Sequence, residues 1–369
     1  MRRILFLSRG GYISGSQRQI YYVVRKLNGG RYEPIVVCPR DGQLVEKLRG
    51  TGVTTDVLRL RPWRKFPNFL SRYVDAAGLV RLARRYGVAV VHNSDLWLNA
   101  YSTWVARRLG VPCILHVRTP ISEVNVKKHG CDEADFIIAI SKRVRRDLLA
   151  AGISDRKITV IDDAVDTGLF NSRRPTVNVL RRDFAPSGRV LVGLVGRVEP
   201  LKRQLAFLKT AQQIVRGLRA SVTFFIIGQV HCRAYFKKLS EFVTASKLEN
   251  HVIFTGRRED MPAVLKSLDV LVSFSGGSVM FEAMACGIPV ISAGYSTKED
   301  SVHIQDGRTG FLVTSTNDSE LVPVLTRLIE DSLLRRQVGT QASLWAQNWL
   351  SCDRMVEKTI RVYEGLSVD

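Results

Sequence analysis

The sequence predicts an α/β protein with two doubly wound domains in tandem. The chain has 369 residues, which exceeds the size at which a single hydrophobic core keeps growing, so two domains are expected. Apolar runs of strand length alternate with helix-like stretches throughout the chain, a pattern typical of parallel sheets covered by helices on both faces. Hydrophobic residues make up 45% of the chain, which is enough to fill two cores.

The first series of apolar runs predicts a domain at residues 1–170. Each run has the length of a strand, and the segments between the runs carry apolar residues at helical spacing. Strands are expected at residues 4–6, 34–37, 88–91, 113–117, 136–140 and 158–161, with helices that include 18–27, 76–86 and 142–151. A polar stretch follows and predicts a linker at residues 171–187.

The second series predicts a domain at residues 188–345. Strands are expected at residues 190–195, 222–227, 252–254, 270–274, 289–292 and 310–313, and helices at 203–216, 233–245, 261–266, 279–286, 318–331 and 334–348. A last helix within residues 346–369 is expected to return to the first domain. Doubly wound domains bind ligands at the carboxyl ends of their strands, so the loops there are the candidate site.

Several classes of protein lack their sequence signatures in this chain. No apolar run reaches the roughly 18 residues of a membrane span, and Ser8 and Arg9 interrupt the apolar N-terminus before it reaches signal-peptide length. The six cysteines include no Cys-x-x-Cys pair, so neither a zinc site nor a disulfide framework is indicated and a cytoplasmic location is expected. Without a G-x-G-x-x-G or a Walker sequence, dehydrogenases and P-loop enzymes are disfavoured. Ser278 lacks the second glycine of a nucleophile elbow, which disfavours a serine hydrolase.

Positive charge is concentrated in the first half of the chain. The formal net charge is +21, and residues 1–175 hold 31 basic and 15 acidic side chains, so this half carries +16. The asymmetry indicates an anionic partner, which is a nucleic acid, a phosphorylated substrate or an anionic membrane surface. The alternative is a basic surface that only keeps the protein soluble. A nucleic acid is disfavoured because no helix-turn-helix or RNA-binding signature is present.

One glycine-rich segment, SFSGGSVMFEAMACGIPVIS at residues 273–292, combines the features of an anion site. Gly276 and Gly277 allow the backbone to approach a ligand, and Ser278 is expected to cap the following helix. The amides that follow, including that of Val279, then face a diphosphate with the helix dipole behind them. Glu282 is placed to accept hydrogen bonds from a ribose diol. The alternative is that Glu282 only complements the helix dipole.

The chain resembles the retaining, nucleotide-sugar-dependent glycosyltransferases of the GT-B class, those related to glycosyltransferase family 4 and called glycosyl transferases group 1. The resemblance rests on FEAMACGIPVI, on GRVEPLK at 196–202, DDAVDTGLF at 162–170 and DGRTGFLV at 306–313, and on the weaker SGSQRQ at 14–19 and AISKRVRRDLL at 139–149. It implies two Rossmann-like domains that face each other across a cleft.

The resemblance also implies roles for individual residues. Arg197 and Lys202, after the glycine at position 196 (Gly196), match the basic pair that clamps the donor diphosphate, and Glu282 matches the ribose-binding glutamate. A clamp of this kind stabilises the charge that the leaving group gains. The nucleotide sugar is then a co-substrate, and neither a metal nor another cofactor is expected.

Residues of the first domain are assigned to the acceptor side, some by the same resemblance and others by their place at a strand end. His116 is similar to the family's histidine near the transferred sugar, and Arg118 follows it into the loop. Asn93 and Asp95 end another strand, where Asp95 is either a base or the cap of a helix at residues 96–108. Three residues of the glycine-rich turn, Gly15, Ser16 and Gln17, complete the set.

The sequence departs from the family pattern at three places. Phe274 occupies the position of a second glutamate, which contacts the transferred hexose in the family, and Gln17 replaces a glutamate. The pair at 163–164 is Asp-Ala instead of Asn-Gly. Glu299 or Asp300 could replace the missing acid at position 274.

We therefore expect a retaining glycosyltransferase that acts on a lipid-linked or polymeric saccharide in cell-envelope synthesis. The alternatives are a nucleotide-sugar epimerase or hydrolase on the same fold and a catalytically silent nucleotide-sugar-binding relative. A docking surface for anionic membranes is expected where cations and aromatics alternate, which involves Arg59, Arg61, Trp63, Arg64, Lys65, Phe66, Phe69, Arg72 and Tyr73. The alternative is that these aromatic side chains pack inside the first domain.

Overall fold

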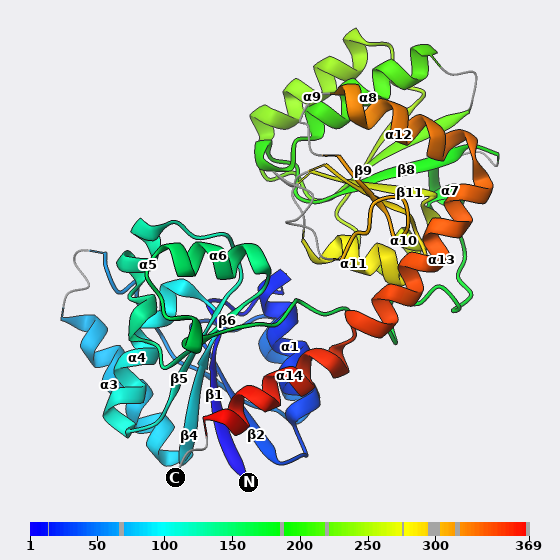
Figure 1. Cartoon of the computed structure of the whole chain (residues 1–369). Coiled ribbons are helices and arrows are strands. Elements are labelled where there is room, and N and C mark those ends of the chain that lie inside the picture. Colours follow the sequence, from blue (N-terminus) through cyan, green and yellow to red (C-terminus); the bar gives the residue numbers. More distant parts are fainter. Residues whose placement is uncertain are drawn as a thin grey trace. The chain divides into compact units, whose positions relative to one another are not determined.

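The computed structural model describes residues 1–13, 15–65, 70–184, 188–217, 221–274, 277–293, 303–313 and 318–366. The chain divides into two compact units, of which the first comprises Met1–Ala164 and Cys352–Asp369 and the second Val165–Ser351. Each unit contains one parallel sheet with helices on both faces (Figure 1). The prediction of two doubly wound α/β domains is therefore confirmed.

The sheet of the first unit has seven strands in the order β3-β2-β1-β4-β5-β6-β7. Every neighbouring pair is parallel. The order reverses between β1 and β4, and at such a switch point a crevice forms beyond the carboxyl ends of the strands. The strands are β1 (Arg2–Leu7), β2 (Tyr32–Cys38), β3 (Thr54–Val57), β4 (Val88–Asn93), β5 (Cys113–Val117), β6 (Phe136–Ala139) and β7 (Ile158–Val160). The apolar runs do not indicate β3, because three of its four residues are polar.

Alternation along the strands divides their side chains between the two faces of this sheet. Ile4 and Phe6 of β1 join the core beneath α1, α2 and α14, whereas Leu5 and Leu7 join the core beneath α3 and α4. Helices α5 and α6 cover the rest of this second face. The helices are α1 (Gly15–Leu27), α2 (Gln43–Gly50), α3 (Ser71–Arg85), α4 (Asn99–Leu109), α5 (Glu123–His129), α6 (Lys142–Ala150) and α14 (Cys352–Gly365), with short 3-10 helices η1 (Leu96–Leu98), η2 (Cys131–Glu133) and η3 (Asp155–Lys157).

Helix α14, at the end of the chain, packs against α1 at the start of the chain. The side chain of Tyr363 is fully buried in the core that the two helices share. Two ion pairs lie at the margin of this contact, one between Lys26 and Asp353 at 2.5 Å and one between Arg31 and Glu364 at 2.8 Å. The C-terminal segment is thus an integral part of the first unit.

The sheet of the second unit has the order β10-β9-β8-β11-β12-β13, again with parallel pairs throughout. Its switch point lies between β8 and β11, so the loops after these two strands border the predicted ligand crevice. The strands are β8 (Val190–Val195), β9 (Val222–Ile227), β10 (Val252–Gly256), β11 (Val270–Ser273), β12 (Val290–Ser292) and β13 (Phe311–Leu312).

The helices of the second unit cover the two faces of its sheet in two groups. Val192 and Leu194 of β8 pack beneath α8, α9 and α12, and Leu191 packs with α7, α10, α11 and α13. The helices are α7 (Val179–Phe184), α8 (Gln204–Gly217), α9 (Arg233–Ala245), α10 (Met261–Ser267), α11 (Ser278–Ala285), α12 (Asp318–Glu330) and α13 (Ser332–Trp349), with the 3-10 helix η4 (Pro200–Lys202).

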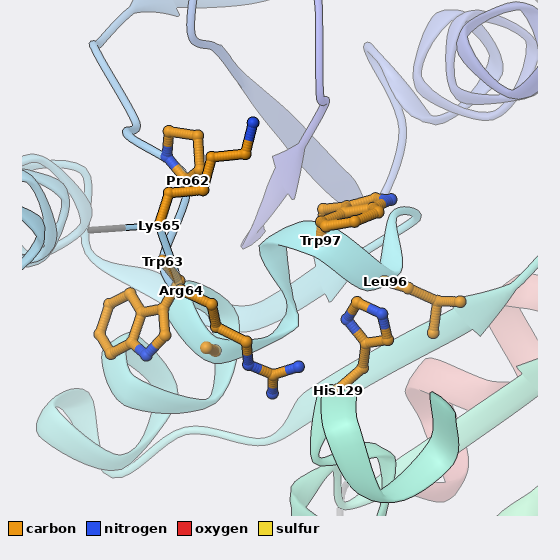
Figure 2. A pocket seen from close by; sticks show the side chains of 8 residues that line it. Pro62, Trp63, Arg64, Lys65, Leu96, Trp97 and His129 are labelled. Carbon is orange, nitrogen blue, oxygen red and sulfur yellow. The ribbon is translucent and has the colours of Figure 1, made fainter. Parts of the chain in front are cut away.

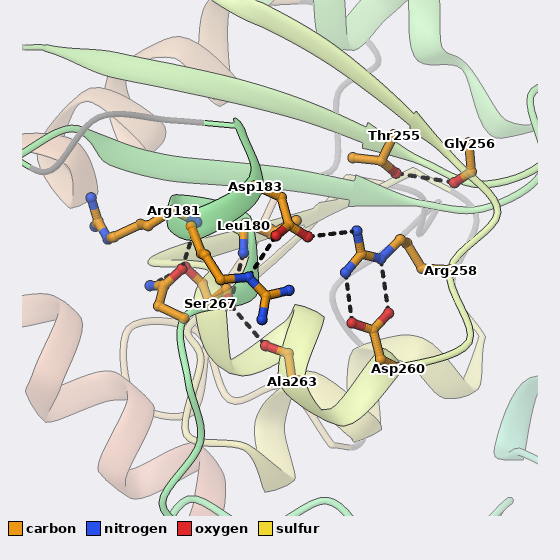
Figure 3. A network of polar contacts seen from close by, with 11 residues as sticks. Leu180, Arg181, Asp183, Thr255, Gly256, Arg258, Asp260, Ala263 and Ser267 are labelled. Atoms are coloured by element: carbon orange, nitrogen blue, oxygen red, sulfur yellow. Dashed lines mark hydrogen bonds and ion pairs between the residues drawn. The ribbon is translucent and has the colours of Figure 1, made fainter.

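The predicted linker at 171–187 differs from the structure, because residues 165–184 belong to the second unit. Leu180 of α7 is fully buried in the core of that unit. Polar contacts hold α7 as well: Arg181 pairs with Asp269 at 3.0 Å, and the Arg258 guanidinium lies between Asp183 at 3.1 Å and the carboxylate of Asp260 (Figure 3). The apolar residues within this charged stretch explain the difference. Residues 185–187 lie outside the described part of the chain.

Candidate active site

The loops after β8 and β11 bring together the residues that the sequence assigns to the donor. Gly196, Arg197 and Lys202 follow β8, and Gly277 and Glu282 follow β11. The two strands are adjacent and parallel, so their carboxyl ends lie at the same edge of the sheet. Gly276, the other predicted glycine, lies outside the described residues.

Close backbone contacts shape the loop after β8. A Cβ atom at Gly228 would come within 2.0 Å of the Gly196 carbonyl oxygen, so residue 228 must be glycine. A Cβ atom at Gly196 would lie 3.4 Å from the Cδ of Lys202, which shows that the lysine stem packs over this glycine. The loop after β8 thereby folds back onto the carboxyl end of β8.

A buried glutamate, which the sequence reasoning missed, orders the basic pair. The Glu199 carboxylate lies 2.8 Å from an Arg197 amino group, and the Arg197 carbonyl accepts a hydrogen bond from Gln204. Arg197 itself is exposed, so its charge is available to a ligand. Burial lowers the pKa of Lys202, Glu199 opposes this shift and Arg197 adds to it. The only sequence signal for Glu199 was its place between the two predicted cations.

The start of α11 corrects the predicted cap. Gly277, with φ 105° and ψ 169°, is the N-cap, and Ser278 is the first helical residue. A left-handed φ of this kind is open to glycine and costly for serine, so the glycine determines where the helix begins. Val279 is the second helical residue, and the Met280 amide donates to the Gly277 carbonyl at 3.2 Å. The amides nearest the crevice are therefore those of Ser278 and Val279.

Glu282 lies in the second turn of α11, and its side chain is only 3% exposed. The effect of the helix dipole on a carboxylate falls off within the first turn. The position of Glu282 therefore disfavours the alternative in which this acid only complements the dipole.

Phe274 replaces the family's second glutamate with an aromatic contact. Its ring is buried, and the Arg203 guanidinium lies 5.3 Å from the ring centroid, within the range of a cation–π interaction. This contact ties the loop after β8 to the end of β11. The sequence reasoning missed Arg203, although it directly follows the predicted Lys202. Glu299 and Asp300, the proposed substitutes for the missing acid, lie outside the described residues.

In the first unit, His116 of β5 belongs to a buried polar chain. An Arg118 amino group lies 3.0 Å from the His116 Nδ1 atom, and Arg118 pairs with Asp163. Arginine can only donate, so Nδ1 accepts and the proton of the neutral ring is on Nε2. Among the described residues, His116 Nε2 has no hydrogen-bond partner although it is buried. His116 therefore offers a hydrogen-bond donor that a ligand oxygen can satisfy.

His92 of β4 extends the set of buried polar contacts around His116 into the core. Its ring stacks on His116 at a centroid distance of 6.0 Å, and its Nδ1 lies 2.7 Å from the Tyr363 hydroxyl. Burial, followed by the charge of Arg118, lowers the pKa of His92 to about 3. Burial, Arg118 and His92 lower the pKa of His116 well below its ordinary value. Both rings are therefore neutral near pH 7, and the partnership with Tyr363 was not expected from the sequence.

Asn93 and Asp95 form a tight turn at the end of β4. The Asp95 amide donates to the Asn93 side chain at 3.0 Å, and the Trp97 amide donates to the Asp95 carboxylate at 2.9 Å. Asp95 has the capping role that the sequence allowed, but it caps η1, because α4 begins only at Asn99. Burial raises the pKa of Asp95, while the Trp97 hydrogen bond and Arg9 oppose that shift.

The glycine-rich turn is the start of α1. Gly15 is the first helical residue, and the Ser16 hydroxyl donates to the side chain of the buried Gln17 at 3.0 Å. Gln19 was not predicted, yet its amide group exchanges two hydrogen bonds of 2.9 Å with the Ala164 backbone. Because Ala164 follows the Asp163 that pairs with Arg118, Gln19 helps to place that ion pair.

The predicted docking segment is partly engaged within its own unit, whereas Arg59, Arg64, Lys65 and Tyr73 are exposed. Arg61 pairs with the buried Asp75, and Arg72 donates to the Trp63 carbonyl at 2.7 Å. The Trp63 ring packs edge-on against Tyr101 at 4.8 Å. Trp63 thus packs as the alternative expects, whereas Tyr73 is 41% exposed. Phe66 and Phe69 lie outside the described residues.

The described residues show neither a metal cluster nor a membrane-spanning helix. Within those ranges, no group of three or more His, Cys, Asp or Glu side chains is placed to hold a metal ion. None of the helices in the described part of the chain is both long and apolar enough to cross a membrane.

Comparison with known proteins finds relatives of both units. The family described as Glycosyltransferase Family 4 matches residues 13–169, and the family described as Glycosyl transferases group 1 matches residues 180–345. The D-inositol 3-phosphate glycosyltransferase of Salinispora tropica is 27% identical over 323 residues, which cover 78% of this chain and 65% of that protein. The GDP-mannose-dependent alpha-mannosyltransferase of Mycobacterium tuberculosis is 26% identical over 371 residues, which cover 93% and 92% of the two chains.

Solved structures show the same fold. The Anabaena protein HepE, crystallised with UDP and glucose, superposes with a TM-score of 0.85 over 100% of both chains at 21% identity. The chain spans less than two thirds of the length of some curated relatives that it matches, 59% and 65% in two cases.

Proposed function

The chain belongs to the group 1 glycosyltransferases of the GT-B class, and we propose that it transfers a sugar from a nucleoside diphosphate to a saccharide acceptor. The observation that carries the proposal is the meeting of Arg197, Lys202 and the start of α11 at the switch point of the second sheet. Cations and helix amides at such a crevice suit a diphosphate. In this proposal the second unit binds the donor.

Each donor-side group has a distinct part in the proposed reaction. Arg197 and Lys202 offset the charge that the diphosphate gains as its bond to the sugar breaks, which stabilises the transition state more than the bound substrate. Glu282 accepts hydrogen bonds from the ribose. The two cations replace a metal ion in this scheme, so the transfer is proposed to be metal-independent.

The first unit is proposed to hold the acceptor. His116 Nε2, a buried donor among the described residues, would bind a hydroxyl oxygen of the sugar or acceptor, with Arg118 fixing the ring. Retention of the anomeric configuration is proposed from the family resemblance. The acceptor is proposed to be a lipid-linked or polymeric saccharide of the cell envelope, and the net charge of +16 in residues 1–175 supports reversible attachment to an anionic membrane surface.

The test is turnover with a panel of nucleotide sugars. Release of nucleoside diphosphate is followed with and without saccharide acceptors, with and without a metal chelator, in the wild type and in Arg197→Ala and Lys202→Ala. We expect both variants to reduce kcat more than they raise the donor KM, because their partner charge grows toward the transition state. Lys209→Ala, an exposed lysine of α8, is the control.

Other outcomes would separate the alternatives. Wild-type kcat in both variants would contradict the assignment of the diphosphate site. Release of nucleoside diphosphate that does not depend on the acceptor would indicate a hydrolase. Interconversion of the nucleotide sugar would indicate an epimerase. Binding of nucleotide sugars without any reaction would indicate a silent relative.

A further inference from the structure

A pocket lies at the carboxyl edge of the first sheet, in a place that the proposed catalytic groups do not use. It contains about 350 Å³ of space that opens to solvent. Figure 2 shows Arg64 and Lys65, from the segment after β3, on one wall, and Leu96, Trp97 and His129 on the other. The Arg64 guanidinium extends toward His129.

Trp97 gives this pocket an exposed aromatic surface. The indole is 51% exposed, and the His129 ring meets it edge-on at a centroid distance of 5.2 Å. The Arg9 guanidinium and the Lys128 amino group lie 5.1 and 5.9 Å from the indole centroid, within the range of cation–π interactions. These contacts hold the indole in place, while Trp97 as a whole residue keeps about half of its surface exposed.

The cations around the pocket lack carboxylate partners. In the ranges that the structure describes, Arg9, Arg64, Lys65 and Lys128 form no ion pair. Asp95 is close enough to Arg9 to be affected by its charge, but its carboxylate accepts from the Trp97 amide. Arg64 and Lys65 line the pocket, and Arg9 and Lys128 lie against the Trp97 ring at its side. This grouping of positive charge favours an anionic ligand.

We infer that this pocket is an acceptor subsite for a sugar ring that carries a phosphate or carboxylate group. The inference rests on the proposed function, because it assigns the site to the acceptor of that reaction. The apolar face of the ring stacks on Trp97, and the anionic group meets Arg64 with its planar fork of donors, with Lys65, Arg9 and Lys128 nearby.

The location of the pocket agrees with an acceptor subsite. Leu96, which lines it, packs against the cluster that contains Leu115 and Val117 of β5, and these residues flank His116 in the strand. Because side chains alternate along a strand, His116 lies on the opposite face, near the core that contains Phe6 and Tyr363. An acceptor seated in the pocket therefore shares the carboxyl edge of the sheet with the His116 Nε2 and reaches it across that edge. A hollow beside a partly exposed indole fits a sugar ring better than it fits a flat membrane surface. Trp63, on the wall with Arg64 and Lys65, packs edge-on against Tyr101 and is not free to enter a membrane.

The experiment measures binding of small anionic sugars to the full chain by saturation-transfer NMR. The probes are glucose 6-phosphate and glucuronate, compared with glucose and inorganic phosphate, and the variants are Trp97→Ala and Arg64→Gln. We expect both anionic sugars to bind more tightly than glucose or phosphate, with affinity at least tenfold lower in Trp97→Ala and at least threefold lower in Arg64→Gln. The control is Arg108→Gln, which removes a matching cation–π contact on α4 outside the pocket and should change nothing.

Several results would overturn the inference. Equal affinity for phosphate and the anionic sugars, unchanged in Trp97→Ala, would indicate a plain anion site. No sugar binding, together with binding to anionic vesicles that Trp97→Ala abolishes, would assign the indole to a membrane surface. No binding of any probe would also exclude the subsite. Titration of the same variants with nucleoside diphosphates distinguishes the two proposals. If only the acceptor subsite is wrong, nucleoside diphosphates still bind. If the protein binds no nucleoside diphosphate, the proposed function itself is contradicted.

Discussion

At the scale of single residues, burial determines what the two histidines of the first unit can do. His116 and His92 are neutral because the interior disfavours their charged forms and Arg118 adds a repelling charge. A neutral ring whose Nδ1 accepts from arginine can donate through Nε2 but does not supply a proton as an acid. We therefore assign His116 to orientation of a sugar oxygen and not to general acid catalysis.

The same burial predicts a dependence of stability on pH. The pKa of His92 falls from an ordinary value of 6.5 to about 3 on folding, so the unfolded chain takes up a proton that the folded protein excludes. The free energy of unfolding should therefore decrease as the pH drops below about 6.5, and the loss for this one ring is about 2 kcal/mol at pH 5. His116 adds to the effect in the same direction. Urea denaturation between pH 7 and 5 measures the slope.

His92→Gln should flatten this slope, whatever its effect at pH 7. Phe6→Leu is the matched control, because the Phe6 ring contacts His92 at a centroid distance of 4.9 Å but carries no titrating group. It should lower stability equally at all pH values. A slope that remains unchanged in His92→Gln would contradict the prediction.

A second prediction at this scale concerns Glu282. Glu282→Gln keeps the volume of this buried side chain and removes its charge, so we expect folding to persist while nucleoside diphosphate affinity falls about 10- to 100-fold, the scale of a hydrogen bond to a charged group. Calorimetric titration measures it. The control uses the ligand: a 2′-deoxynucleoside diphosphate should bind the wild type less tightly than the ribonucleotide, and the variant should hardly distinguish the two. Equal discrimination by both proteins would remove Glu282 from the ribose.

At the scale of elements, the strands are the best predicted parts of the chain. Buried parallel strands are continuous apolar runs, so all the expected strands are present, with small changes at their ends. The run at 88–91 stops short because His92 and Asn93 are polar, yet both pair with β1 in the sheet. Backbone pairing continues beyond the last apolar residue. The sequence therefore predicts the end of β4 too early, before His92 and Asn93.

Contacts between distant residues account for what the sequence could not predict in the site. The motifs located Arg197, Lys202 and Glu282 because each lies in a local pattern. The partner of His92 is 271 positions away at Tyr363, and no local pattern connects them. The stacking of Arg203 on Phe274 is likewise a tertiary contact.

The start of α11 gives a prediction for this scale. Gly277→Ala places a Cβ atom at φ 105°, so the helix start should shift, at a cost of about 1 to 2 kcal/mol in stability. Affinity for nucleoside diphosphate should fall with it, because the amides of the first turn move. Gly217→Ala is the matched control, since this residue ends α8 with no positive φ and open space around its Cβ position. Unchanged affinity in Gly277→Ala would exclude the first turn of α11 from the site.

At the scale of the whole molecule, the first unit is built from both ends of the chain. Residues Met1–Ala164 form its sheet, and Cys352–Asp369 supply the helix that covers α1. The fully buried Tyr363 ring lies 5.3 Å from the Tyr32 ring and bonds to His92. The chain therefore passes between the two units twice, and a segment far from the site in sequence supports a site histidine.

A chain that ends at Ser351 should be destabilised in its first unit alone. Loss of a buried aromatic side chain costs about 3 to 5 kcal/mol, and the whole helix removes more apolar contact than this. Scanning calorimetry with added nucleoside diphosphate measures the effect, because the ligand should still shift the transition of the second unit. Tyr363→Phe is the control: it keeps the ring, loses the hydroxyl, and should cost about 1 kcal/mol. An unchanged first-unit transition in the shortened chain would contradict the role of α14.

The first unit consists of two separate segments of the chain, which affects how it folds during synthesis. A ribosome makes the sheet of that unit first, but α14 leaves the exit tunnel only after all of Val165–Ser351. Domains generally fold as units during synthesis, so the second unit can reach its native state while the first still exposes the apolar surface of α1 to solvent. The first unit is therefore completed after the second, although its synthesis begins first.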